Sequence, residues 1–179
     1  MRNILLAVAV VLAVPSCAST PKSASEQHTL TNQAQATLAE MKQKAPALEN
    51  TLQGAYAYAV FPDVGKGAFI VGGAGGAGVL FQGGVPIGNV KISKASFGAS
   101  VGAQSMAELV VLSDQNQVNQ LKSGSFDLGA NVQAIVLTTG GALPTGTLRG
   151  TQVFIMPRGG AMVDVSVAGQ RISFEPLAG

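Results

Sequence analysis

From residue 54 onward, the chain consists of short apolar runs, each bounded by Gly, Pro, Asn or Ser. Runs of this length, interrupted so often by turn-forming residues, are typical of β-strands and too short for ordinary helices. Glycine accounts for 23 of the 179 residues, and only 11% are charged, about half the usual share. The sequence therefore predicts one globular domain with a weakly charged, small-residue surface, and it excludes intrinsic disorder.

Helices are predicted ahead of these strands. Apolar residues recur at helical spacing at Leu30, Ala34, Leu38, Met41 and Ala45. Pro46 ends that run, and a second short helix is expected between Pro46 and Gly54. A third short helix, capped by Ser113 and stopped before Gly124, is expected inside the strand-rich part.

Strands are predicted at 55–61, 67–71, 77–82, 87–93, 97–104 and 107–112. The segment from Pro62 to Gly65 is interpreted as a turn between the first two. Alternation of apolar and polar residues predicts a further strand over 126–134 and a terminal hairpin of 161–167 with 172–175. The predicted fold class is α+β, with N-terminal helices followed by a mostly antiparallel, strongly bent sheet and one short inserted helix.

The N-terminus has the features of an export signal. Arg2 precedes an apolar run over 4–14, which is too short to span a bilayer as a helix. The residues from Leu12 to Ser19 resemble a bacterial lipobox, in which Cys17 is acylated and becomes the first residue after cleavage. We expect a signal peptide at 1–16, a tether at 17–28 and one domain at 29–179. The alternative is ordinary secretion with Cys17 left as an unpaired thiol.

The residue types exclude several classes of site. With one Cys and one His, the chain cannot build a disulfide framework or a Cys/His metal cluster, and its scattered charges (net +2) do not indicate nucleic-acid binding. The string from Gly73 to Gly78 matches G-x-G-x-x-G, but a strand rather than a helix is predicted after it, so close backbone packing is the favoured interpretation. Glu108 is expected to point outward from its strand. No enzyme class and no cofactor is predicted.

Several motifs in order resemble the SYLF domain, also described as the Las17-binding, actin-regulating family. They are Tyr58-Ala59-Val60-Phe61-Pro62, the glycine-rich segment 72–80, Ser96-Phe97-Gly98, Phe126-Asp127-Leu128-Gly129 and Met162-Val163-Asp164-Val165. The resemblance runs from about Leu48 to the C-terminus. It implies a lipid-binding module, and bacterial members are commonly exported lipoproteins. The implied ligand here is an anionic phospholipid such as phosphatidylglycerol or cardiolipin.

Basic residues beside glycines or turns are the candidates for headgroup contact: Lys66, Lys91, Lys94, Arg149 and Arg158. The expected protein is an outer-membrane lipoprotein that faces the periplasm or the cell surface and whose domain binds anionic phospholipid. The alternative is a structural or protein-interaction lipoprotein, with an envelope protein as its partner, whose domain does not touch lipid. Clustering of the basic residues on one face favours the first, and scattered positions favour the second.

Overall fold

The computed structural model describes residues 21, 23–67, 72–96, 104–124, 126–129, 132–139, 143, 150–159 and 169–177. Cys17 and the predicted signal peptide lie outside these residues. Two helices come first, α1 (Ala24–Lys44) and α2 (Leu48–Gln53), and α3 (Gln115–Lys122) is inserted between strands. This order confirms the predicted sequence of helices, strands and one inserted helix.

The described strands form one eight-stranded sheet with the order β5-β8-β3-β2-β1-β4-β7-β6. Its strands are β1 (Ala57–Gly67), β2 (Gly72–Gln82), β3 (Val85–Ser96), β4 (Gln104–Leu112), β5 (Phe126–Leu128), β6 (Gln133–Val136), β7 (Gln152–Gly159) and β8 (Gln170–Glu175). Every described neighbouring pair is antiparallel except β6 and β7, which are parallel. The sheet is therefore mixed, with a single departure from the antiparallel arrangement.

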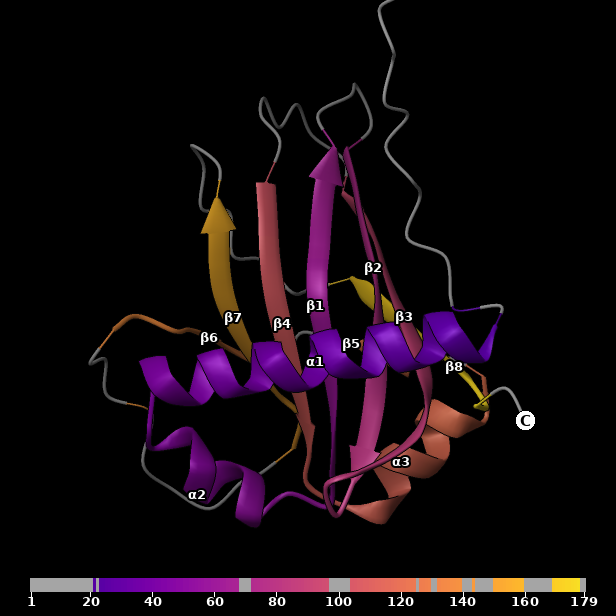
Figure 1. The fold of residues 1–179 in the computed structure, drawn as a ribbon, viewed down its shortest axis with the longest axis horizontal. Helices are drawn as coiled ribbons and strands as arrows, with labels where there is room; N and C mark the ends of the chain where they lie inside the picture. The colour runs from indigo at the N-terminus through magenta and orange to yellow at the C-terminus, as the bar shows by residue number, and fades with distance from the viewer. Residues whose placement is uncertain are drawn as a thin grey trace, which may run out of the picture.

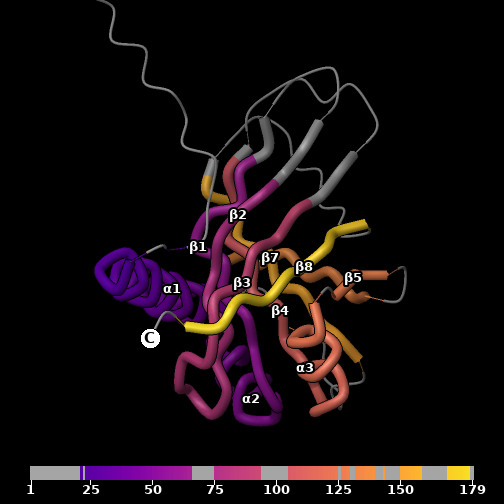
Figure 2. The backbone as a smooth tube through the Cα atoms, turned by 90° about the vertical axis from the view of Figure 1, so that its right-hand side faces the viewer, coloured from indigo at the N-terminus to yellow at the C-terminus, as the bar shows by residue number. Residues whose placement is uncertain are grey.

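Helices cover the two faces of this curled sheet. In Figure 1, α1 crosses in front of the strands, and in Figure 2, α1 lies on one side of the sheet while α3 lies on the other. Each side has its own core. Leu38 and Met41 of α1 pack with Leu109 and Phe154 on the α1 side, whereas Leu121 of α3 belongs to the core of the α3 side.

The sequence explains where α1 begins and ends. The Ser23 side chain accepts a hydrogen bond from the Glu26 backbone N–H, which caps the first turn. This cap makes the helix begin at Ala24 and not near Leu30. The first turn of α1 therefore lies within the segment that was expected to be a tether. The helix ends at Lys44, as Pro46 predicts. α2 likewise ends just before Gly54.

The segment expected to be a turn is a bulge inside one long strand. β1 continues through Pro62 and Asp63, and its register shifts there against both β2 and β4. Phe61 and Val64 nevertheless pack into the same core, a spacing of three residues that a regular strand does not allow. Proline lacks the N–H that a regular strand pairs, and a bulge tolerates it. The expected turn between two strands was therefore wrong, because the segment forms a bulge in β1.

Other strands were predicted with mixed success. β2 and β3 form a hairpin in which Gly83 and Gly84 both have positive φ, as a two-residue turn of this type requires. β8 confirms the strand expected near the C-terminus, while its expected partner at 161–167 lies outside the described residues. The strand β7 was not predicted at all. The strand expected over 126–134 is divided into β5 and β6.

Candidate functional site

A polar groove of about 520 Å³ lies between α1 and the strands β1, β4 and β7. This volume falls within the range of small-molecule sites, roughly 300 to 1,000 Å³. Its polar lining consists of Gln33, Thr37, Glu40, Asp63, Ser105 and Arg158, and Ala36 and Pro62 also line it. The groove thus combines side chains from four elements that are far apart in the sequence.

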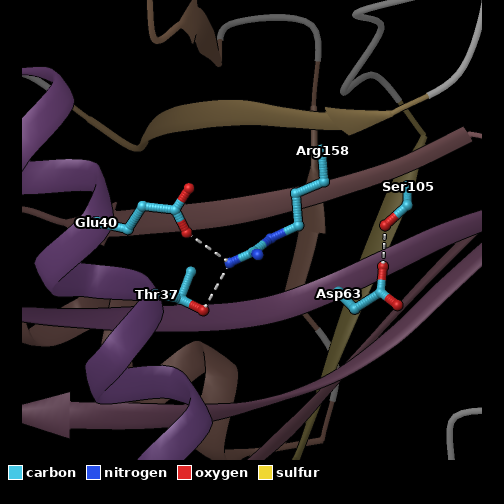
Figure 3. Close-up of polar contacts among 5 residues, drawn as sticks. All are labelled: Thr37, Glu40, Asp63, Ser105 and Arg158. Carbon is cyan, nitrogen blue, oxygen red and sulfur yellow. Dashed lines mark hydrogen bonds and ion pairs between the residues drawn. The ribbon is translucent and has the colours of Figure 1, made fainter.

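Arg158 is held in place by α1. Its Nη2 atom donates a hydrogen bond to Thr37 Oγ1 at 3.1 Å and pairs with Glu40 Oε2 at 3.1 Å (Figure 3). Thr37 and Glu40 lie one helical turn apart, so their side chains leave the same face of α1. The Arg158 and Glu40 side chains are 34% and 43% exposed. Each contact is therefore worth at most about 1 kcal/mol, but together they fix where the guanidinium lies.

Asp63 and Ser105 form the other wall of the groove. Ser105 Oγ donates a hydrogen bond to Asp63 Oδ1 at 2.6 Å, as Figure 3 shows. Asp63 belongs to the bulge of β1, and that irregularity lets its side chain line a groove on the α1 side although Phe61 and Val64 both face the opposite core. Because a turn was expected here, Asp63 was not predicted to be a site residue.

Two of the five predicted headgroup residues share one row of the sheet. Lys66 on β1 and Lys94 on β3 are both Cα partners of Ala74 on β2, which lies between them. Two strand spacings separate their backbones, or about 10 Å. Small residues surround this row, because Gly65 and Gly67 pair with Gly75 and Gly73.

Of the other three candidates, Lys91 and Arg158 are described and lie elsewhere. Lys91 is exposed, and its neighbours Val90 and Ile92 are buried toward α3, so Lys91 points to the α1 side. Arg158 lines the groove, on a strand four places away from β3 in the sheet order. Arg149 lies outside the described residues. The described positions therefore place two candidates in one row and leave Lys91 and Arg158 apart.

Glu108 was expected to point outward, and the structure corrects this. Its side chain is 1% exposed, and Oε1 accepts a hydrogen bond from Gln170 Nε2 at 3.0 Å. The sheet curls and α3 closes its inner side, so both faces of β4 are covered. Apolar residues occupy both odd and even positions along β4, with Leu109 on one face of the strand and Val110 on the other. This pattern leaves β4 no solvent-exposed face for a carboxylate. It is visible in the sequence and would have predicted that Glu108 is buried.

No group of three or more His, Cys, Asp or Glu side chains in the described part of the chain is arranged to hold a metal ion. Within those same ranges, no helix combines the length and apolar character needed to cross a bilayer.

Comparison with known families covers the second half of the chain. Residues 93–176 match the family model described as Ysc84, Las17-binding protein actin regulator. This match supports a SYLF domain over these residues. The match extends from the end of β3 through β4, α3 and β7 to the end of β8, and so begins later than the resemblance expected from about Leu48. A comparison with curated proteins finds none that matches this chain.

The family assignment bears on function at a coarse level. The SYLF family is known for lipid binding. Of the groove residues, Ser105 and Arg158 lie within the matched segment, whereas Thr37, Glu40 and Asp63 precede it. The row through Lys66 and Lys94 likewise combines one residue inside the match with one outside it. Both surfaces therefore depend on the helix and strands that precede the matched segment.

Proposed function

We propose that this protein is a membrane-anchored lipoprotein of the bacterial envelope whose SYLF domain binds anionic phospholipid. The family match supports lipid binding in general. The lipobox-like sequence that ends at Cys17 supports an acyl anchor in the outer membrane, facing the periplasm or the cell surface. The proposal includes no catalytic reaction and no cofactor.

The row of Lys66, Ala74 and Lys94 is the observation that favours an anionic lipid. It places the backbones of two lysines at about the same level of the sheet, about 10 Å apart. Each basic residue near an anionic membrane surface contributes about 1 kcal/mol. The glycines beside the row lack Cβ atoms, so a phosphate is able to approach the backbone closely. Lys91 and Arg149 are retained as secondary headgroup candidates.

Vesicle binding tests this function directly. The chain from residue 17, with Cys17→Ser, keeps every residue that the structure describes and lacks acyl groups. We expect it to sediment with phosphatidylcholine vesicles that contain phosphatidylglycerol or cardiolipin, and not with phosphatidylcholine alone. Binding falls as salt rises from low to physiological concentration, because ions screen the attraction.

Variants locate the contact. Changing Lys66 and Lys94 together to Ala removes about 2 kcal/mol, which corresponds to roughly thirtyfold weaker binding. The matched control changes Lys44 and Lys122 to Ala, which alters net charge equally at two positions away from the row. Equal losses of vesicle binding in both double variants would show that overall charge, and not the row, determines binding. Absence of binding to every vesicle would refute lipid binding by the domain and favour an envelope protein as its partner.

The anchor requires a separate experiment. The full chain is expressed in a bacterial host that is fed an alkyne analogue of palmitate. We expect the label on the wild-type chain and its absence on Cys17→Ala. Label that persists on the variant would contradict acylation at Cys17 and leave ordinary secretion as the explanation of the N-terminus.

A further inference from the structure

We propose that the groove beside α1 is a binding site for a small zwitterion that joins a phosphate to a primary ammonium group, as in phosphoethanolamine. This site is independent of the proposed contact with anionic lipid, because the Lys66 and Lys94 row supplies none of its residues.

The charge balance argues against a simple anion. Two carboxylates, Glu40 and Asp63, line the groove with a single guanidinium, that of Arg158. Glu40 already pairs with that guanidinium, so a bare phosphate would meet a cation that is partly neutralised and a second carboxylate that repels it. A ligand that brings its own positive charge removes this repulsion. If the ligand also has an anionic end, that end pairs with the Arg158 guanidinium.

Arg158 provides the anion-binding end. Both of its contacts use Nη2, and within the described residues no partner contacts Nε or Nη1. Those N–H donors are available to phosphate oxygens, with which charge-assisted hydrogen bonds are strong. Because Thr37 and Glu40 already fix the guanidinium, little side-chain freedom is lost when a ligand binds.

Asp63 provides the cation-binding end. Ser105 donates to Oδ1 of its carboxylate, and no described residue contacts Oδ2. A primary ammonium carries three N–H donors, and Oδ2 together with the amide oxygen of Gln33 offers acceptors on the same groove. A quaternary ammonium has no N–H donor and is usually held by aromatic faces. None of the described residues that line this groove is aromatic, so the site favours phosphoethanolamine over phosphocholine.

Titration with four small molecules tests the inference. The ¹⁵N-labelled chain from residue 17, with Cys17→Ser, is titrated with O-phosphoethanolamine, phosphocholine, inorganic phosphate and ethanolamine. We expect saturable amide shifts at Thr37, Asp63 and Ser105 with phosphoethanolamine, and at least tenfold weaker binding of the other three. Equal binding of phosphoethanolamine and inorganic phosphate would overturn the proposal, as would shifts that occur only outside the groove.

Matched variants exclude indirect effects. Asp63→Asn and Arg158→Gln each weaken phosphoethanolamine binding at least tenfold, because each removes one charged end of the site. The controls are Asp127→Asn and Arg171→Gln, which alter an exposed Arg–Asp pair that does not line the groove. Well-dispersed spectra of every variant show that the fold is kept. Undiminished binding to Asp63→Asn would contradict the ammonium site.

A titration with lipid shows whether the zwitterion is a membrane headgroup or a soluble molecule. Short-chain phosphatidylethanolamine is titrated as a monomer below its micelle concentration and compared with free O-phosphoethanolamine. Tighter binding of the lipid assigns the groove to a membrane headgroup, whereas equal or weaker binding assigns it to a soluble zwitterion. If neither binds while anionic vesicles still do, the groove proposal fails and the proposed lipid function stands.

Discussion

Gln170 on β8 donates a hydrogen bond to Glu108 on β4 at 3.0 Å, although four steps in the sheet order separate the two strands. In a flat sheet, backbones four strands apart are about 19 Å from each other, which is farther than two such side chains reach. The contact therefore exists only because the sheet curls. Both side chains are almost fully buried, at 2% and 1% exposed, so the bond joins opposite walls of the enclosed core.

Gln170→Leu is predicted to lower the free energy of unfolding by about 1 to 3 kcal/mol, since the hydrogen bond from Gln170 to the buried Glu108 side chain is lost. Chemical denaturation of the wild type and the variant measures the difference. The control Gln120→Leu changes an exposed glutamine on α3 and is expected to shift the unfolding midpoint little. Wild-type stability of Gln170→Leu would show that the bond across the core contributes nothing to the fold.

The glycines of β2 give a second prediction, because they pack against β1 to different degrees. A Cβ at Gly78 would lie 2.4 Å from the backbone oxygen of Val60, whereas one at Gly75 would make an ordinary contact at 3.5 Å. Gly78→Ala should cost about 1 to 3 kcal/mol of stability through overpacking. Gly75→Ala should be nearly neutral. Equal urea midpoints for the two variants would contradict close packing at Gly78.

These glycines also show what the sequence was able to predict. The string from Gly73 to Gly78 matches a nucleotide motif, yet the strand pattern after it predicted close backbone packing instead, and β2 confirms this. Helix ends were equally readable, since Pro46 and Gly54 are local signals that act on their own neighbours. These predictions succeeded because the cause lies within a few residues of the effect.

Pairing between distant strands could not be read in the same way. The bulge at Pro62 depends on β1 having neighbours on both sides, and a lone Pro-Asp-Val-Gly segment looks like a turn. The burial of Glu108 depends on the curl of the whole sheet. Within the groove, Arg158 was anticipated as a headgroup contact, but Thr37, Glu40 and Asp63 gain a role only when α1 and the bulge meet it.

The exposed pair of Asp127 and Arg171 gives a prediction for acid pH. The hydrogen bond from Arg171 Nε to Asp127 Oδ1, at 2.8 Å, lowers the pKa of the Asp127 carboxyl below its ordinary value. A carboxyl pKa that is lower in the folded state stabilises the fold above the unfolded-state pKa. That contribution is lost as the pH falls through the folded-state value.

NMR titration of the side-chain carboxyl carbons should show the Asp127 midpoint rising toward its ordinary value in Arg171→Gln. The control Arg158→Gln removes a different arginine and is expected to leave the Asp127 midpoint in place. An unchanged midpoint in Arg171→Gln would show that the pair does not persist in solution.

Tyr58 gives the corresponding prediction for alkaline pH. Its ring stacks on Phe81, with centroids 5.4 Å apart and planes inclined by 19°, and burial raises the pKa of its hydroxyl while nearby Lys42 opposes the rise. A tyrosine pKa that is higher in the folded state means that the full stability is present below the unfolded-state pKa. That stability declines as the pH rises through the folded-state value, because the unfolded chain ionises first.

Ultraviolet titration of the intact protein should therefore contain a late tyrosinate transition that Tyr58→Phe removes and Tyr56→Phe retains. The Tyr58→Phe variant should also lose less stability than the wild type as the pH is raised past this transition, since it has no hydroxyl at this position to ionise. A late transition that survives in Tyr58→Phe would assign the raised pKa to another group and contradict the effect of partial burial on Tyr58.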